Sequence, residues 1–180
     1  MRFVSCAVKY IMILALIGVG CIFTSAAFAL ELTSSAYSDG GDIPERYTGA
    51  GEDISPPLQW SDVPEGTESF VIIMDDIDAP MGIWVHWVIY DIPGDVTTLA
   101  EGVPAEDILP DGVKQGVNDF RRIGYGGPCP PPGSAHRYVI TLYALDGVPK
   151  LGPGLDKASV LEAIEEHELG TARLTGSYQR

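Results

Sequence analysis

The side chains most able to bind a small anion occur in three short segments of the sequence. These are Asp76-Ile77-Asp78-Ala79-Pro80, Trp84-Val85-His86-Trp87, and a Gly- and Pro-rich run that leads into His136. An imidazole donates hydrogen bonds to phosphoryl or carboxyl oxygens and takes up charge near neutral pH, and a neighbouring carboxylate raises its pKa. Asp76, His86 and His136 are therefore the candidates for a small polar pocket.

Each segment also has a purely structural interpretation. An Asp in a turn most often bonds to the local backbone, and a histidine beside two tryptophans is typical of a packed core. In the third segment, residues 124–133, glycines allow the backbone to approach a ligand and prolines keep the loop rigid. The case for a pocket therefore depends on whether the fold brings the three segments together.

Three apolar, β-branched runs predict the strands that position these side chains. Residues 69–75 are typical of a strand buried on both faces. Residues 83–92 predict a second strand. Because side chains alternate with a period of two, one face of this strand carries Trp84, His86, Val88 and Tyr90. Residues 136–145 predict a third strand. Both histidines thus stand where a loop enters a strand, which is a good position for a binding site.

One strong helix is predicted near the end of the chain. Asp156 caps it, Gly170 ends it, and its inward side chains are Val160, Leu161 and Ile164. A final strand is predicted over residues 172–178, and a weaker helical turn over 105–109. The fold class is mostly β, and we expect an antiparallel or mixed β-sandwich with one or two peripheral helices.

Residues 1–29 predict a secretory signal peptide. Arg2 and Lys9 supply the positive start, an apolar run follows, and Ala27-Phe28-Ala29 is typical of a signal-peptidase site. We expect cleavage after Ala29, which leaves residues 30–180 as a single periplasmic or secreted domain. One alternative is a retained membrane anchor, although the apolar run is shorter than the roughly 20 residues that a span needs. Another is lipid attachment at Cys21.

The predicted mature part is strongly acidic. The whole chain has a formal net charge of −14, and loss of the two positive charges of Arg2 and Lys9 makes it −16. This charge argues against nucleic acid as a partner and against an anionic membrane surface. Of the three cysteines, only Cys129 lies outside the leader, so the mature chain has no partner for an intrachain disulfide.

Taken together, the motifs resemble the phosphatidylethanolamine-binding protein family, which includes the Raf-kinase inhibitor proteins. The segments that carry the resemblance are residues 37–44, 55–60, 76–80, 84–86, 127–131, 136–138 and 169–178. Each is weak alone, but their order and spacing are specific and cover nearly all of the mature part. The length and the Cys-Pro-Pro sequence at Cys129 resemble the bacterial branch of the family.

The resemblance implies a β-sandwich with a shallow anion pocket at one end. It assigns to the pocket an acidic wall, Asp76; its loop residues, Asp78 and Pro80; two imidazoles, His86 and His136; flanking rings, Trp84 and Tyr138; and closing backbone at Gly126, Gly127 and Pro128. Its implied ligands are phosphate, phosphorylated headgroups or small carboxylates. Because Asp76 repels a dianion, a monoanion or a zwitterion such as phosphoethanolamine is favoured.

The sequence departs from the family pattern at two places. Ile77 stands where many relatives have proline, which loosens the acidic loop. Gly49-Ala50 replaces the Cys-Asp pair common in bacterial relatives, which removes a partner for Cys129.

Three functions follow from the sequence. The leading hypothesis is an exported, non-catalytic binding protein without cofactor, metal ligands or catalytic residues. An alternative is an inhibitor of a secreted or periplasmic protease or other hydrolase, since an exported protein cannot reach a cytosolic kinase. The third is a metal-dependent phosphoesterase, in which two histidines and a carboxylate bind a metal. No His-Glu-x-x-His or Gly-x-Ser-x-Gly motif supports this third function.

Overall fold

The computed structural model describes residues 29–180, so the predicted leader lies outside the described residues except for Ala29. Two sheets form the fold, one of six strands in the order β2-β9-β8-β4-β5-β7 and one of three in the order β1-β3-β6. The elements are β1 (Glu31–Thr33), β2 (Gly41–Asp42), the 3-10 helix η1 (Glu45–Tyr47), β3 (Leu58–Ser61), β4 (Ser69–Asp76), β5 (Trp84–Pro93), β6 (Thr98–Leu99), β7 (Lys114–Gln115), β8 (His136–Leu145), α1 (Lys157–Ile164) and β9 (Glu168–Tyr178). All strand pairs are antiparallel except β2 with β9. The predicted mixed β-sandwich is confirmed.

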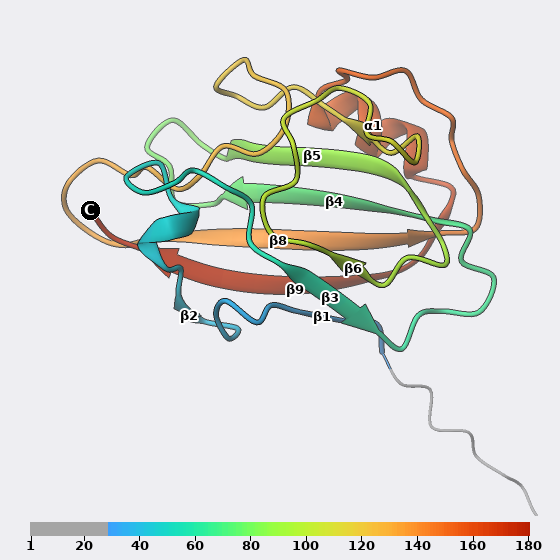
Figure 1. The fold of residues 1–180 in the computed structure, drawn as a ribbon, viewed down its shortest axis with the longest axis horizontal. Helices are drawn as coiled ribbons and strands as arrows, with labels where there is room; N and C mark the ends of the chain where they lie inside the picture. The colour runs from blue at the N-terminus through green and yellow to red at the C-terminus, as the bar shows by residue number, and fades with distance from the viewer. Residues whose placement is uncertain (1–28) are drawn as a thin grey trace, which may run out of the picture.

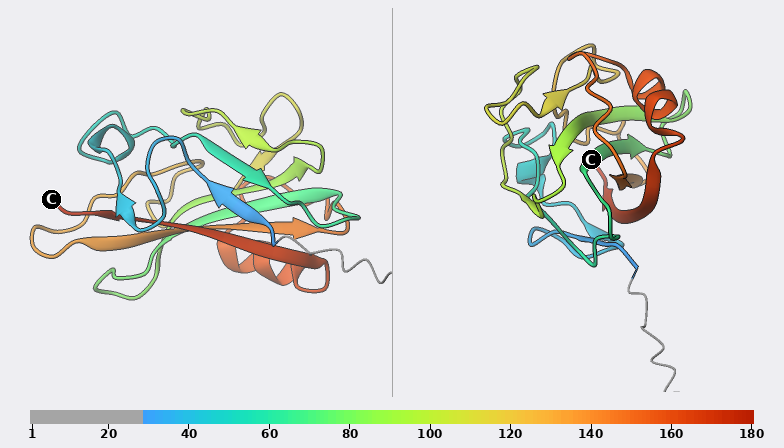
Figure 2. Two further views of the ribbon diagram at one scale, coloured as in Figure 1. Left: turned by 90° about the horizontal axis from the view of Figure 1, so that it is seen from below. Right: turned by 90° about the vertical axis from the view of Figure 1, so that its right-hand side faces the viewer.

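The two faces of the six-stranded sheet bury different partners. In Figure 2 (left), α1 lies on one side of the long strands, and the blue and teal strands β1 and β3 lie on the other. The main core fills the space between the sheets, where the Trp60 ring of β3 packs edge-on against Phe70 of β4 at 5.3 Å. A smaller cluster beneath α1 contains Val71, Ile73 and Val160. The prediction that β4 is buried on both faces is therefore confirmed.

His86 occupies an irregularity in the pairing of β4 with β5. Met74 pairs with Trp87, but the next residue, Asp75, pairs with Val85. His86 is thus an extra residue with no partner opposite it, which is the definition of a β-bulge. The predicted strict alternation over residues 83–92 is wrong for this reason.

The bulge determines which way the His86 ring points. Beyond it, Trp87 packs in the core between the sheets, whereas Val88 and Tyr90 pack in the cluster beneath α1. The His86 ring lies on the Trp87 side, where it meets the edge of Tyr138 at 5.1 Å between ring centroids. A regular strand would have placed His86 on the helix side with Val88 and Tyr90.

The predicted helix forms, but its end differs from the prediction. Asp156 is the N-cap, and its side chain accepts a hydrogen bond from the Ser159 N–H at 2.8 Å. The helix ends at Ile164, and Gly170 lies inside β9 opposite Ala144. Gly170 therefore does not end the helix, because pairing with β8 extends the last strand back to Glu168.

The predicted helical turn over residues 105–109 is also wrong. This stretch is a loop with one isolated bridge, in which Ile108 pairs with Lys114. A short 3-10 helix, η1, occurs instead at residues 45–47. No helix within residues 29–180 combines the length and the hydropathy needed to cross a membrane.

Antiparallel pairing brings distant loops to one end of the sheet. Asp76, the last residue of β4, pairs with Trp84 at the start of β5 and with Tyr138 near the start of β8. His136, the first residue of β8, pairs with Tyr178 at the end of β9. In Figure 1 this is the left-hand end, where the C-terminus also lies. The register of β4, β5 and β8 therefore gathers the three candidate segments.

Candidate ligand-binding site

A cleft of about 270 Å³ opens at this end of the sandwich. Five of the residues expected in the pocket line it, namely Asp76, Pro80, Trp84, His86 and His136. The side chains of Asp76, His86 and His136 are nearly fully buried, with 4%, 2% and 6% exposed respectively. The remaining lining residues are mostly apolar. The result is a small, mostly apolar cleft with three ionisable side chains.

Asp76 and His136 form a buried, hydrogen-bonded pair. His136 Nδ1 donates to Asp76 Oδ2 at 2.8 Å, because a carboxylate can only accept. The other carboxylate oxygen accepts the Asp78 N–H at 2.9 Å, which ties the start of the β4–β5 loop to the same side chain. Nε2 of His136 has no hydrogen-bond partner among the described residues.

His86 is fixed in the same way by the backbone. Its Nδ1 donates to the Gly126 carbonyl, and the Gly126 N–H returns a hydrogen bond to the His86 carbonyl at 2.9 Å. The ring lies against the edges of Phe120 and Tyr138, at centroid distances of 5.2 and 5.1 Å. Residues 29–180 offer no partner to its Nε2. Both imidazoles therefore use Nδ1 within the protein and keep Nε2 free.

Burial lowers the pKa of His86 below its ordinary value. The Gly126 carbonyl and the carboxylate of Asp76 raise the pKa in opposition, but burial is the larger effect. His86 is thus neutral near neutral pH. Since its proton is held on Nδ1, its Nε2 is a hydrogen-bond acceptor.

Asp78 does not line the cleft, but it holds the β4–β5 loop against β8. It accepts hydrogen bonds from the Arg137 backbone N–H at 2.9 Å and from Arg137 Nε and Nη2 at 2.8 and 2.7 Å. This bidentate contact lowers the pKa of Asp78 to about 2. Asp78 thus shapes the loop, as expected, by joining it to β8.

The backbone of Gly126, Gly127 and Pro128 stands behind the cleft rather than at its surface. Gly126 bonds to His86, the Gly127 N–H donates to Asp53 Oδ1 at 2.6 Å, and the Pro128 carbonyl accepts from Gly49 N. A Cβ on Gly127 would lie only 2.7 Å from a backbone carbon, so glycine is required there. The surface in front of them comes from Cys129, Pro130 and Pro131.

Tyr138 supports the cleft from below. It is fully buried, and its hydroxyl has no hydrogen-bond partner within residues 29–180. Burial and the nearby Asp76 carboxylate both raise its pKa. The phenol therefore stays neutral, and its ring fixes the position of His86 by edge contact.

Phe120 is the main cleft residue that the sequence did not indicate. Its ring packs edge-on against Trp84 at 5.5 Å and against His86 at 5.2 Å, and the Arg122 guanidinium lies 5.3 Å from its centroid. It lies in an irregular loop, in which no periodic pattern indicates where a side chain points. The other lining residues that were not predicted also lie in loops, namely Ala79, Met81, Cys129, Pro130 and Pro131.

Known proteins with the same pattern identify the family. The family model described as phosphatidylethanolamine-binding protein matches residues 33–179. The chain belongs to the phosphatidylethanolamine-binding protein family. A "UPF0098 protein" of Methanothermobacter thermautotrophicus is 54% identical, with 84% of this chain and 99% of that protein covered. One from Aquifex aeolicus is 46% identical, with coverage of 88% and 94%.

Two solved structures of this family share the fold. A phosphatidylethanolamine-binding protein homolog from Chlamydia trachomatis, CT736, has a TM-score of 0.78 at 41% identity and covers 84% of this chain and 98% of its own. Escherichia coli YbcL, described as a member of the mammalian family, has a TM-score of 0.78 at 34% identity, with coverage of 85% and 99%. The resemblance seen in the sequence is thus confirmed, as is its implied fold.

A metal site does not emerge from the geometry of the described residues. Over residues 29–180, no three or more His, Cys, Asp and Glu side chains are grouped so that they could bind a metal ion. Asp76 instead contacts His136 directly, and Nδ1 of His86 is held by a carbonyl.

Proposed function

We propose that this chain is an exported, non-catalytic protein whose cleft binds a small anion such as phosphate, a phosphorylated headgroup or a carboxylate. One observation carries the proposal. Both imidazoles use Nδ1 for a protein acceptor, so that Nε2 of His86 and of His136 remains for a ligand in the same cleft. Export is inferred from residues 1–29 of the sequence alone.

The charges in the cleft favour particular ligands. Asp76 is a buried carboxylate, and His86 has a lowered pKa, so the cleft is a poor environment for a dianion. A monoanion that brings a proton to Nε2 of His86 avoids this cost. A zwitterion avoids it as well, because an ammonium group can approach Asp76. Phosphoethanolamine has both properties.

The arrangement supports binding rather than catalysis. Cys129 is the one thiol in the cleft wall, and the charged group at its Sγ is the Arg180 guanidinium, 3.4 Å away. A guanidinium does not accept a proton, so it cannot act as the general base for a thiol. The net charge of −16 outside the leader argues against nucleic acid and against stable association with an anionic membrane after cleavage.

Histidine NMR tests the proposal directly. The chain has three histidines, and the third, His167, is exposed and pairs with Asp146 far from the cleft. Titration with phosphate and with phosphoethanolamine is expected to shift the ring signals of His86 and His136 and to leave His167 unchanged. If neither cleft histidine responds to any small anion, or if all three respond alike, the proposal fails.

The Asp76→Asn variant distinguishes the two ligand types. It removes the negative charge but keeps the shape and the acceptor oxygen. We expect tighter binding of phosphate, which the carboxylate repels, and weaker binding of phosphoethanolamine, whose ammonium loses its counter-charge. Asp146→Asn, which changes the same kind of pair at His167, is the matched control and should alter neither affinity.

A second candidate function, inhibition of an exported hydrolase, is favoured by the β4–β5 loop. Met81 is 93% exposed, and Ile83 is 59% exposed beside the mouth of the cleft. Exposed apolar side chains on a loop are a common feature of protein contacts. Capture of a hydrolase by the wild type, with loss of capture by Met81→Ser/Ile83→Ser, would support it. Failure to inhibit any captured hydrolase would eliminate it.

A further inference from the structure

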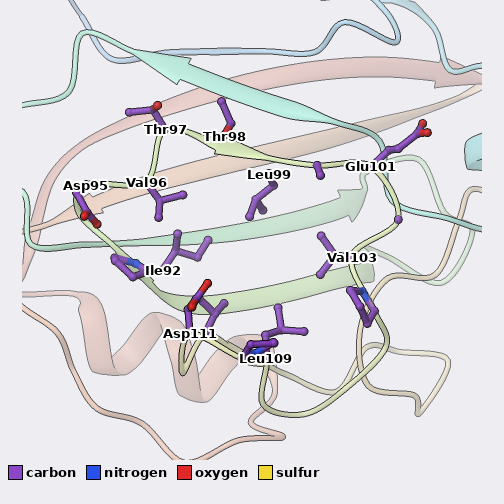
Figure 3. A pocket seen from close by; sticks show the side chains of 16 residues that line it. Ile92, Asp95, Val96, Thr97, Thr98, Leu99, Glu101, Val103, Leu109 and Asp111 are labelled. Atoms are coloured by element: carbon purple, nitrogen blue, oxygen red, sulfur yellow. The ribbon is translucent and has the colours of Figure 1, made fainter.

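A second and larger cavity, of about 1000 Å³, lies on another part of the molecule. It is formed by the end of β5, by β6 and by the loop over residues 100–113, and it shares no residue with the ligand cleft. Figure 3 shows the apolar side chains Ile92, Val96, Leu99, Val103 and Leu109 gathered around it. The anion-binding proposal does not involve this cavity.

The floor of the cavity is a continuation of the main core. Ile92 and Val113 are buried, and four half-buried side chains pack against the core cluster, namely Val96, Leu99, Val103 and Leu109. The buried part of each of these four side chains packs against the core, which fixes its position. The exposed parts therefore form a stable apolar surface. Apolar side chains of a partner would find a preformed site there.

The backbone at one wall is the edge of a sheet. β6 is the last strand in the order β1-β3-β6, and it pairs with β3 through Leu99 with Leu58 and Thr98 with Gln59. Within the described residues no strand pairs with its other side, and Thr97, Thr98 and Leu99 line the cavity. An edge strand beside an apolar groove can accept an extended chain as a further strand.

The rim of the cavity is acidic and lacks local counter-charge. From residue 94 to residue 113 the chain contains no Lys or Arg, and its acidic residues are Asp95, Glu101, Glu106, Asp107 and Asp111. Glu101 is occupied by Arg46 and by the Tyr47 hydroxyl, and the nearby Lys114 pairs with Asp91. Asp95 and Asp111 line the cavity and make no ion pair within residues 29–180.

We propose that this cavity is a docking groove for an extended segment of a partner polypeptide in which apolar residues alternate with Lys or Arg. The backbone of the segment adds to β6, its apolar side chains cover Val96, Leu99 and Val103, and its cations face Asp95 and Asp111. A second copy of this chain is disfavoured as the occupant, because it would bring an equally acidic rim against this one.

A fluorescein-labelled peptide of alternating leucine and lysine is the probe for this groove, with fluorescence anisotropy as the measurement. The test variant is Asp95→Asn/Asp111→Asn. The matched control, Glu162→Gln/Glu166→Gln, removes the same charge from exposed positions on and just after α1, beyond the opposite face of the sheet. We expect the test variant to weaken binding about fivefold and the control to leave it unchanged. Equal weakening by both variants would show attraction by net charge alone and overturn the proposal.

Three further measurements test strand addition, the independence of the two sites and the identity of the occupant. The same peptide with every backbone nitrogen methylated has no N–H to donate to an edge strand, and its binding should be lost. Undiminished binding of the methylated peptide would overturn the strand model. Saturation with phosphate should leave peptide affinity unchanged, since the two sites are separate. A dimer, seen by sedimentation, that excludes the peptide would assign the groove to a second copy instead.

Discussion

His136 Nδ1 donates to Asp76 Oδ2 across 2.8 Å, and both side chains are almost completely buried where β4 ends and β8 begins. A second Asp–His pair, Asp146 with His167, has the same 2.8 Å distance but is about half exposed. The chain thus contains the same contact in a buried and in an exposed setting. The two pairs differ in burial and in the hydrogen bond that Asp76 also accepts from the Asp78 N–H.

Asp76→Asn should lower the free energy of unfolding by about 2 kcal/mol, which is typical of the loss of a buried hydrogen bond to a charged group. Asp146→Asn should change it little, because solvent screens the exposed pair. Urea unfolding of both variants near neutral pH measures the difference. Similar losses in the two variants would mean that burial does not strengthen the Asp76–His136 contact.

The lowered pKa of His86 makes stability depend on pH in a defined direction. Below its unfolded pKa, about 6.5, the unfolded chain binds a proton that the folded chain does not take up. Its contribution to stability is therefore complete above about pH 6.5 and is lost as pH falls toward the lowered folded pKa. Unfolding free energies between about pH 8 and pH 5 should fall more steeply for wild type than for His86→Gln. His167→Gln should keep the wild-type slope.

Ligand binding should take up a proton at His86. Nδ1 of His86 is committed to the Gly126 carbonyl, so Nε2 must gain a proton before it can donate to an anion. A small carboxylate stays ionised near neutral pH, which makes the protein the proton acceptor. Calorimetry in two buffers with different ionisation enthalpies should show uptake in wild type. The His86→Gln variant donates from its amide and should show none; identical heats for wild type in both buffers would disprove the mechanism.

The grouping of Asp76, His86 and His136 could be predicted because these residues sit at or near strand ends. The apolar runs of β4, β5 and β8 are clear patterns, and antiparallel pairing forces their ends together. The bulge at His86 could not be predicted, because the alternation of side chains within β5 does not show which of its residues lacks a pairing partner on β4. Phe120 was missed because long-range contacts position its loop. The predicted helix end at Gly170 was wrong because pairing with β8 outweighed the tendency of glycine to end a helix.

The contact of Asp78 with Arg137 should control the β4–β5 loop at low pH. Arg137 holds the pKa of Asp78 at about 2, below the ordinary 3.8, so the contact persists as pH falls through about 4 and is lost toward pH 2. In Arg137→Gln, carboxyl NMR should show the Asp78 pKa returning toward its ordinary value. Arg173→Gln, which changes an exposed arginine that forms no ion pair within residues 29–180, is the control. An unchanged Asp78 pKa in Arg137→Gln would show that the ion pair does not set it.

The structure places Gly49 directly against Cys129. A Cβ built on Gly49 would lie 3.2 Å from Cys129 Cβ and 3.7 Å from its Sγ, so an outward shift of a few tenths of an ångström would give the Cβ–Cβ separation of a disulfide, about 3.5–4.5 Å. Gly49→Cys should therefore form a disulfide with Cys129 under oxidising conditions and leave no titratable thiol in the chain without its leader. Closure of this long loop should raise the free energy of unfolding by about 4 kcal/mol. Gly49→Ser adds a side chain of similar size without the bond, and it should be no more stable than wild type. If oxidised Gly49→Cys keeps both thiols, or gains nothing over its reduced form, the Cys129 loop is not held against residue 49 as the structure has it.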